Sequence, residues 1–127
     1  YPSSATVSAL LDGNTYPIGQ CTWYVYNRLV EAGSPHYNWL GNGQDWVRGL
    51  VARGWTFSDK PVAGSVVSVA GGFGYTLPQY GHVAYVEYVN EDGTFLISEC
   101  NVSGIQNKIH WAVWTNQTYF TFAIPPK

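Results

Sequence analysis

The stretch YPIGQCTWYVYNRLVEA, residues 16–32, changes from a loop into a helix and places a cysteine at the junction. Pro17 and Gly19 favour turns, and the residues after Gln20 repeat their apolar side chains with helical spacing. Gly33 is typical of the left-handed position that follows a helix. One predicted helical face carries Cys21, Tyr24, Val25, Arg28, Leu29 and Ala32.

Cys21 lies in the first turn of this predicted helix. The backbone N–H groups there have no intrahelical acceptor, and the helix dipole is positive at that end. Both effects stabilise a thiolate, so we expect the pKa of the thiol to lie below its ordinary value of about 8.5. The position suits a nucleophile. The alternative is a small buried hydrophobic residue, which is the commoner role of a single cysteine.

The composition indicates a globular domain with an unusually uncharged surface. Of 127 residues, 46% are apolar and 11% are charged. A net charge of −2 without a basic patch argues against nucleic-acid binding, and no apolar run approaches the length of a membrane span. We expect residues 1–127 to form a single domain, with residues 1–13 as an N-terminal arm, excised from a longer multidomain protein.

The remaining patterns predict helices first and antiparallel strands afterwards, which is an α+β fold. A second helix is expected to begin near Asn42, a plausible N-cap, with Asp45 completing a partial capping box and Gly54 ending the helix. The strands are predicted at residues 64–70, 82–89, 94–101, 109–114 and 119–124.

A turn at residues 90–93 joins two of these strands into a hairpin. The register of this hairpin determines which side chains share a face. If those four residues form the loop and the flanking residues pair, His82 lies opposite Asn101 and diagonal to Glu99 on one face. A two-residue loop keeps this arrangement. A three-residue loop would break it unless a β-bulge restored the register.

Together these residues predict thiol-based acyl transfer. Cys21 would attack a carbonyl, and His82 would take the thiol proton and pass it to the leaving amine. Glu99 or Asn101 would accept a hydrogen bond from the other ring nitrogen and orient the imidazole. The N–H of Cys21, with the Gln20 side chain as a second donor, would form the oxyanion hole. Taken alone, each of these polar residues has a structural explanation.

The other chemically distinctive residues are expected to have structural roles. Cys100 would point away from Glu99 into the core, which makes it a poor disulfide partner for Cys21. His36 in a loop and His110 on a later strand have no motif around them, so surface or packing roles are expected. Four aromatic residues either line a substrate groove or belong to the core: Trp23, Trp39, Trp46 and Tyr80.

Three segments, YPIGQCTWYVYNR, YGHVAYVEYVN and DGTFLISECN, resemble the motifs of the CHAP family, the cysteine, histidine-dependent amidohydrolases/peptidases. NWLGNGQDWV and PVAGSVVSV are similar to its intervening segments, so the resemblance runs from about residue 14 to residue 103. It implies a papain-like α+β fold with helices packed on a twisted antiparallel sheet. It also implies that Cys21 is the nucleophile and His82 the base, with Glu99 and Asn101 assisting.

The resemblance further implies an extracellular enzyme that acts on bacterial peptidoglycan. Family members cut either the N-acetylmuramoyl–L-alanine bond or a bond within the peptide stem or cross-bridge. They occur in autolysins, phage lysins and conjugation systems, often covalently linked to other domains. The alternatives are a catalytically silent wall-binding module of the same fold and a papain-like transferase or protease with another substrate. The residues expected near the substrate are Gln20, Trp23 and Tyr80.

Some family members bind calcium in the loop before the cysteine through several acidic side chains. Asp12 and Asn14 fit that pattern, but Trp23 stands where a further acidic ligand would be. We therefore expect no cofactor. The tail, residues 105–127, is less typical of the family and is expected to contribute to substrate choice.

Overall fold

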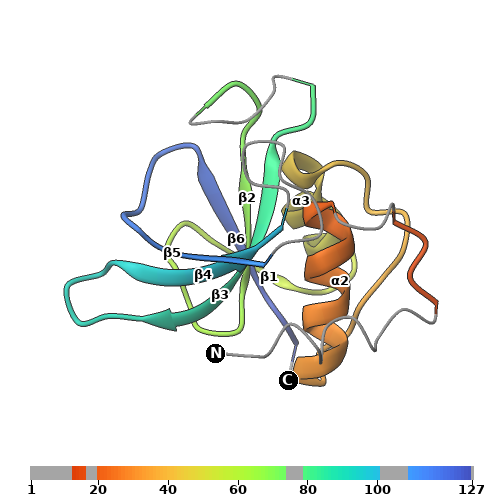
Figure 1. The fold of residues 1–127 in the computed structure, drawn as a ribbon, viewed down its shortest axis with the longest axis horizontal. Coiled ribbons are helices and arrows are strands. Elements are labelled where there is room, and N and C mark those ends of the chain that lie inside the picture. Colours follow the sequence, from red (N-terminus) through yellow and green to blue (C-terminus); the bar gives the residue numbers. More distant parts are fainter. Residues whose placement is uncertain (1–12, 17–19, 74–78, 101–108, 127) are drawn as a thin grey trace.

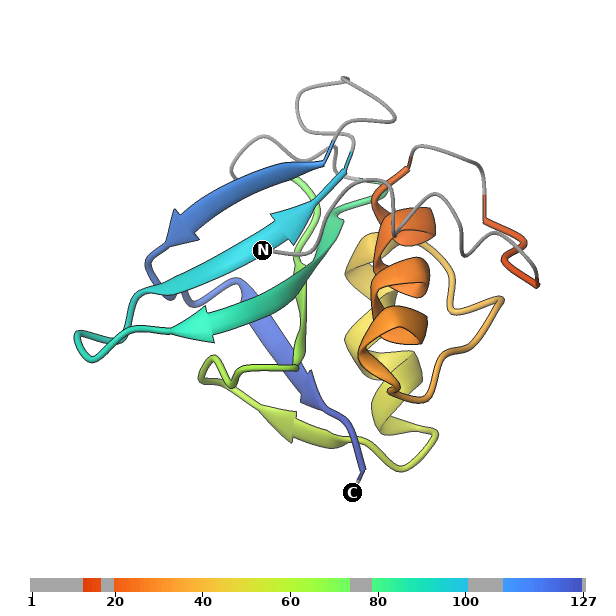
Figure 2. The same ribbon diagram turned by 60° about the horizontal axis from the view of Figure 1, so that its bottom comes forward.

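The structure is a computed structural model that describes residues 13–16, 20–73, 79–100 and 109–126. Its elements are α2 (Cys21–Ala32), the short 3₁₀ helix η1 (Gly43–Asp45), α3 (Trp46–Val51), β1 (Thr56–Ser58), β2 (Val66–Val69), β3 (His82–Val89), β4 (Phe95–Glu99), β5 (His110–Trp114) and β6 (Phe120–Ile124). The strands form one antiparallel sheet in the order β1-β6-β2-β3-β4-β5. Both α-helices lie on the same side of it (Figures 1 and 2). The predicted α+β arrangement is confirmed. No helix in these ranges is long and apolar enough to cross a membrane.

Helix α2 has the predicted bounds, and Gly33 follows it with a φ of 74°. Its burial extends beyond the predicted face, because Trp23 and Asn27 are buried as well. Trp23 belongs to the core cluster, and the side-chain amide of Asn14 donates to the carbonyl of Trp23 and to the side chain of Asn27. The segment before the helix therefore covers a second side of it.

The second helical region begins as predicted. The backbone N–H of Asn42 donates to the Asp45 carboxylate at 3.3 Å, which is the return half of a capping box. η1 leads directly into α3, where Trp46 and Leu50 are fully buried. Val51, also part of the predicted apolar stripe, is 36% exposed.

The sheet buries apolar side chains on both faces. One core cluster lies between the sheet and the helices, and Tyr24, Trp46 and Cys100 belong to it. On the other face, Trp114 of β5 stacks on Phe120 of β6 with ring centroids 5.2 Å apart. Three strands separate β5 from β6, so the sheet curves strongly around this second cluster. The second cluster comprises Val67, Val69, Ala84, Val86, Phe95, Ile97, Phe120 and Phe122.

The β3–β4 hairpin corrects the expected four-residue loop. Val89 pairs with Phe95 rather than with Thr94, and the Asn90 N–H donates to the Thr94 carbonyl at 2.8 Å. These contacts close a three-residue loop, which shifts the register by one residue. An irregularity in the pairing, a β-bulge at Glu87, then compensates for the shift.

Beyond the bulge the predicted register is restored, with Val86 opposite Ile97 and Tyr85 opposite Ser98. Because side chains alternate along a strand, His82 and Glu99 share the face that carries the second cluster. The bulge is therefore what brings these two side chains to one face.

β1 was missed, because its three residues are too few to show a period; it pairs with the end of β6. The proposed N-terminal arm lies outside the described residues except for Gly13, and the single-domain assignment stays a prediction.

Candidate active site

The site centres on a buried imidazole–carboxylate pair at one end of the sheet. His82 is the first residue of β3 and is 4% exposed, and Glu99 is the last residue of β4 and is 0% exposed. Nε2 of His82 lies 2.6 Å from Oε1 of Glu99. The carboxylate accepts, so Nε2 carries the proton. The other ring nitrogen, Nδ1, is then the one directed at a different partner.

That partner is the Cys21 thiol, whose interaction with the His82 side chain lowers the pKa of the thiol and raises the pKa of the imidazole. Cys21 is half-buried at the start of α2, and Figure 2 shows this end of the helix beside the start of β3. The backbone N–H groups of Val83 and Thr22 lower the pKa of the thiol further. The helix therefore presents the thiol, and the sheet presents the base.

The charges in this cluster favour a thiolate–imidazolium pair. Burial opposes the charge of Cys21, but the hydrogen bond and positive charge of His82, with the N–H groups of Val83 and Thr22, outweigh it and lower the pKa of the thiol. Burial also disfavours the charge of His82, but the hydrogen bonds and charges of Cys21 and Glu99 raise the pKa of its imidazole to about 9. Opposite shifts of paired groups are typical of reactive sites.

Two glycines allow the backbone of His82 to approach its neighbours closely. A Cβ on Gly43 of η1 would overlap the His82 carbonyl carbon and stand 2.6 Å from its Cα. Gly81 has a φ of 63°, and a Cβ there would overlap Gln44 and the carbonyl of Val69. η1 is therefore packed against the start of β3 without an intervening side chain.

Sequence reasoning missed one member of the cluster. Nδ1 of His110 lies 2.8 Å from Oε2 of Glu99, so the carboxylate joins two imidazoles. His110 stands directly opposite Glu99 in the β4–β5 pairing. The sequence shows no turn signal that sets the β4–β5 register, so it did not indicate this contact.

The remaining residues expected at the site divide by exposure. Trp23 is 7% exposed and lies in the core, which leaves little of its ring for substrate, whereas Tyr80 is 50% exposed. Gln20 is half-buried as the N-cap of α2. Trp46 is fully buried, and Trp39 is 80% exposed with a left-handed φ of 66°. Asn101 lies outside the described residues, so its proposed part in the site stays a prediction.

Cys100 is fully buried in the helix-facing cluster, as predicted, and neither cysteine forms a disulfide. Asn14 has a structural role in which its side-chain oxygen accepts from the Tyr16 N–H at 3.0 Å. Asp12, the other residue considered for calcium, lies outside the described residues. Within the described ranges no group of three His, Cys, Asp or Glu side chains could hold a metal ion.

A helix-borne thiol facing a sheet-borne imidazole, with a third polar group behind the imidazole, is the arrangement of papain-like cysteine hydrolases. The sequence model of the CHAP domain matches residues 11–101. The chain therefore belongs to the CHAP domain family.

Relatives of the chain are considerably longer proteins. It is 45% identical over 95 residues to an N-acetylmuramoyl-L-alanine amidase domain-containing protein of Staphylococcus aureus, covering 74% of this chain and 15% of that protein. It is 41% identical over 90 residues to N-acetylmuramoyl-L-alanine amidase sle1 of Staphylococcus epidermidis, covering 71% of this chain and 26% of that protein. The chain thus spans about a quarter or less of these relatives.

Solved structures agree with this assignment. A crystal structure of N-acetylmuramoyl-L-alanine amidase from Staphylococcus aureus matches with a TM-score of 0.79 and 34% identity, over 87% of this chain and 32% of that chain. The crystal structure of Ly7917 matches with a TM-score of 0.62 and 17% identity, over 98% of this chain and 63% of that chain, and shares the fold. The predicted CHAP fold is confirmed.

Proposed function

We propose that this domain hydrolyses an amide bond of bacterial peptidoglycan, outside the cell, with Cys21 as the nucleophile. The observation that carries the proposal is the chain of contacts from the Cys21 thiol through His82 to Glu99. The substrate follows from the relatives, two of which are named as N-acetylmuramoyl-L-alanine amidases. On that basis we expect the bond between muramic acid and L-alanine to be cut.

In the first half of the reaction, the Cys21 thiolate attacks the carbonyl carbon of the amide. The oxyanion forms beside the N–H of Cys21, which belongs to a helical turn whose N–H groups have no intrahelical acceptor. The His82 imidazolium gives its proton to the leaving amine as the C–N bond breaks. A thioester between the sulfur and the acyl group remains.

In the second half, neutral His82 takes a proton from water as the water oxygen attacks the thioester. The C–S bond breaks, the acid is released, and the thiolate–imidazolium pair is restored. Glu99 accepts from Nε2 throughout, so it keeps Nδ1 directed at the sulfur and stabilises the imidazolium. Gln20 and Asn101 are proposed to assist at the oxyanion, and Tyr80 offers an exposed ring to the substrate.

This chemistry uses a thiol, an imidazole and backbone N–H groups, so we propose that it needs no metal. Calcium bound near Asp12 and Asn14 would act on the loop rather than on the reacting bond. Activity measured after EDTA treatment, with and without added calcium, tests this part of the proposal.

Cys21→Ala should abolish hydrolysis of purified Staphylococcus aureus cell walls, with a rate at least ~1000-fold below that of the wild type. Cys100→Ala is the matched control, because it removes the other thiol, which is fully buried in the helix-facing cluster, and should leave activity largely intact. Circular dichroism should show that both variants are folded. Equal lysis by Cys21→Ala and the wild type would refute the proposal.

Mass spectrometry of the released fragments identifies the bond. A new N-terminal alanine indicates the amidase reaction, and a new terminus within the stem or cross-bridge indicates an endopeptidase. If the wild-type protein sediments with cell walls but releases no fragments, the domain is a wall-binding module without turnover. That result would overturn the proposed hydrolysis.

A further inference from the structure

The Glu99 carboxylate is fully buried and uses its two oxygens on two different imidazoles. Oε1 lies 2.6 Å from Nε2 of His82, and Oε2 lies 2.8 Å from Nδ1 of His110. The second contact joins adjacent strands, because Glu99 and His110 are directly opposed in the β4–β5 register. His110 is thus placed by the sheet itself, at the first residue of an edge strand.

Hydrogen bonding determines what His110 contributes. A carboxylate oxygen only accepts, so Nδ1 of His110 carries a hydrogen in both the neutral and the charged ring. The side chain of His110 is 50% exposed, whereas that of Glu99 is fully buried. His110 therefore donates to a buried carboxylate from the solvent side. Because His110 is itself half-exposed, replacing it removes little buried surface.

A carboxylate on a glutamate side chain can rotate, and only some orientations direct an oxygen at Nε2 of His82. Two donors on opposite oxygens restrict that rotation more than one does. The ionisable groups linked to Glu99 are His82 on β3 and His110 on β5, with Cys21 beyond His82.

We propose that His110 is a positioning residue for the hydrolytic site: its Nδ1–H holds Oε2 of Glu99, so that Oε1 stays directed at His82. The role rests on the proposed function of Cys21, His82 and Glu99. His110 does not touch the reacting atoms, and it acts through Glu99 alone.

Three substitutions test this role. His110→Ala removes the donor, whereas His110→Asn places an amide N–H close to the position of Nδ1, and His110→Gln places one near Nε2 instead. We expect His110→Ala to lower kcat about tenfold with KM changed less than twofold. His110→Asn should recover most of kcat, and His110→Gln should not. An unchanged kcat in His110→Ala, or equal recovery by Asn and Gln, would overturn the proposal.

A second measurement does not depend on catalysis. The imidazole of His82, labelled with ¹⁵N, can be titrated by NMR in each variant. If orientation of Glu99 is what His110 supplies, the pKa of His82 falls in His110→Ala from its raised value of about 9 and is retained in His110→Asn. If His110 merely competes for the carboxylate, its removal leaves the pKa of His82 unchanged or raises it, and the proposal is wrong.

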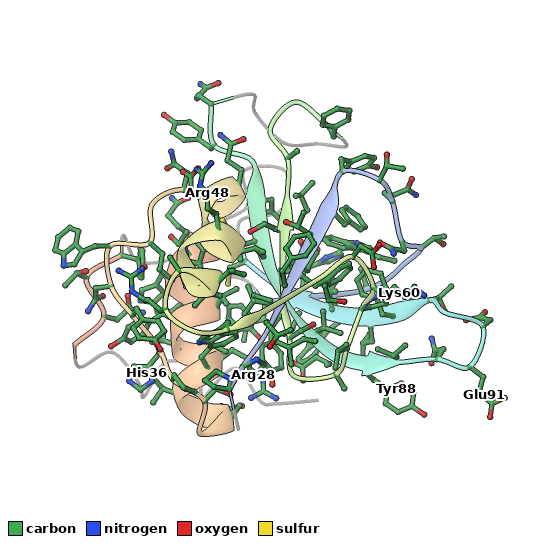
Figure 3. The ribbon with its side chains drawn as sticks, turned by 180° about the vertical axis from the view of Figure 1, so that it is seen from behind. Arg28, His36, Arg48, Lys60, Tyr88 and Glu91 are labelled. Atoms are coloured by element: carbon green, nitrogen blue, oxygen red, sulfur yellow. The ribbon has the colours of Figure 1, made fainter. Side chains whose placement is uncertain are left out.

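His36→Ala is the control for loss of a histidine. His36 contacts the Ser34 carbonyl and the Tyr26 ring, and Figure 3 shows it beside α2. It should alter neither kcat nor the His82 titration. A wild-type protein that fails to hydrolyse walls would refute the proposed function, while the NMR titration would still decide whether His110 orients Glu99.

Discussion

The Cys21 sulfur is stabilised as an anion by partners from two separate elements. The N–H of Thr22 belongs to the first turn of α2, whereas the His82 ring and the N–H of Val83 belong to β3. The helix N-terminus alone explains part of the lowered pKa, and the imidazole explains the larger part. The reactivity of this thiol therefore depends on how precisely the helix and the strand meet.

These shifts predict the pH range in which the ion pair exists. The pKa of the thiol is lowered and that of His82 is raised to about 9, so the charged pair is present between the two values. We expect iodoacetamide to alkylate Cys21 rapidly at pH 7, below the ordinary thiol pKa of about 8.5. Hydrolysis should decrease as the pH rises through about 9, because His82 then lacks the proton for the leaving amine.

Peptide mapping of the alkylated protein checks the first part, since buried Cys100 should remain unlabelled. In His82→Ala, alkylation of Cys21 at pH 7 should slow markedly, because the imidazole, which contributes most to stabilising the thiolate, is absent. Wild-type alkylation that follows an ordinary thiol titration would contradict the ion pair.

At the scale of elements, the site depends on η1 lying directly against the start of β3. Gly43 permits this contact, because any Cβ there would overlap the backbone of His82. The adjacent Gln44 contributes two hydrogen bonds: its backbone N–H donates to the Tyr80 carbonyl, and its side-chain oxygen accepts from the Gly71 N–H. The backbone position of His82 thus depends on the close packing of η1 against the start of β3.

Gly43→Ala should therefore destabilise the fold by about 1–3 kcal/mol and slow the alkylation of Cys21 at pH 7, because His82 and Val83 must move. Urea denaturation and the alkylation rate measure the two effects. Gly49→Ala in α3 is the matched control: its Cβ would meet side chains and no backbone, the nearest atom being the end of Leu40 at 2.9 Å, with Arg53 Nη1 at 3.7 Å. A Gly43→Ala variant with wild-type stability and alkylation rate would show that the close approach of η1 to His82 does not require glycine at position 43.

For the molecule as a whole, one ion pair connects the helix that carries the nucleophile to the strand that carries the base. Arg28 of α2, labelled in Figure 3, binds Glu87 through two hydrogen bonds of 2.9 Å. Glu87 is the bulge residue of β3 and also accepts from the Ser98 hydroxyl at 2.7 Å. The pair is largely buried, with side chains 14% and 10% exposed.

Arg28→Met should lower the free energy of unfolding by about 3 kcal/mol, because it leaves the Glu87 carboxylate buried without its cation. Arg48→Met is the control. Arg48 also pairs with an acidic residue, Asp45, but its side chain is 81% exposed, so a change of about 0.5 kcal/mol or less is expected. Chemical denaturation of both variants makes the comparison, and equal losses would contradict a structural role for the Arg28–Glu87 pair.

Much of the fold was predictable because its signals are local. The apolar spacing after Gln20 and the glycine at position 33 defined α2, and the alternation from His82 defined β3 to the residue. The pairing of His82 with Glu99 was also predictable, since a hairpin brings nearby residues onto one face. That prediction held although its loop was wrong, because the bulge at Glu87 restored the register.

Sequence by itself therefore determined the class of fold, the position of Cys21 at a helix start and the placement of His82 and Glu99 on one face, and it left open whether Glu99 or Asn101 orients the imidazole. Only the tertiary structure decided the bulge at Glu87, the contact of His110 with Glu99 and the ion pair between Arg28 and Glu87. The physical reason is the separation along the chain. Local periodicity reports the conformation of one segment, whereas strand register and contacts between layers result from how distant segments pack.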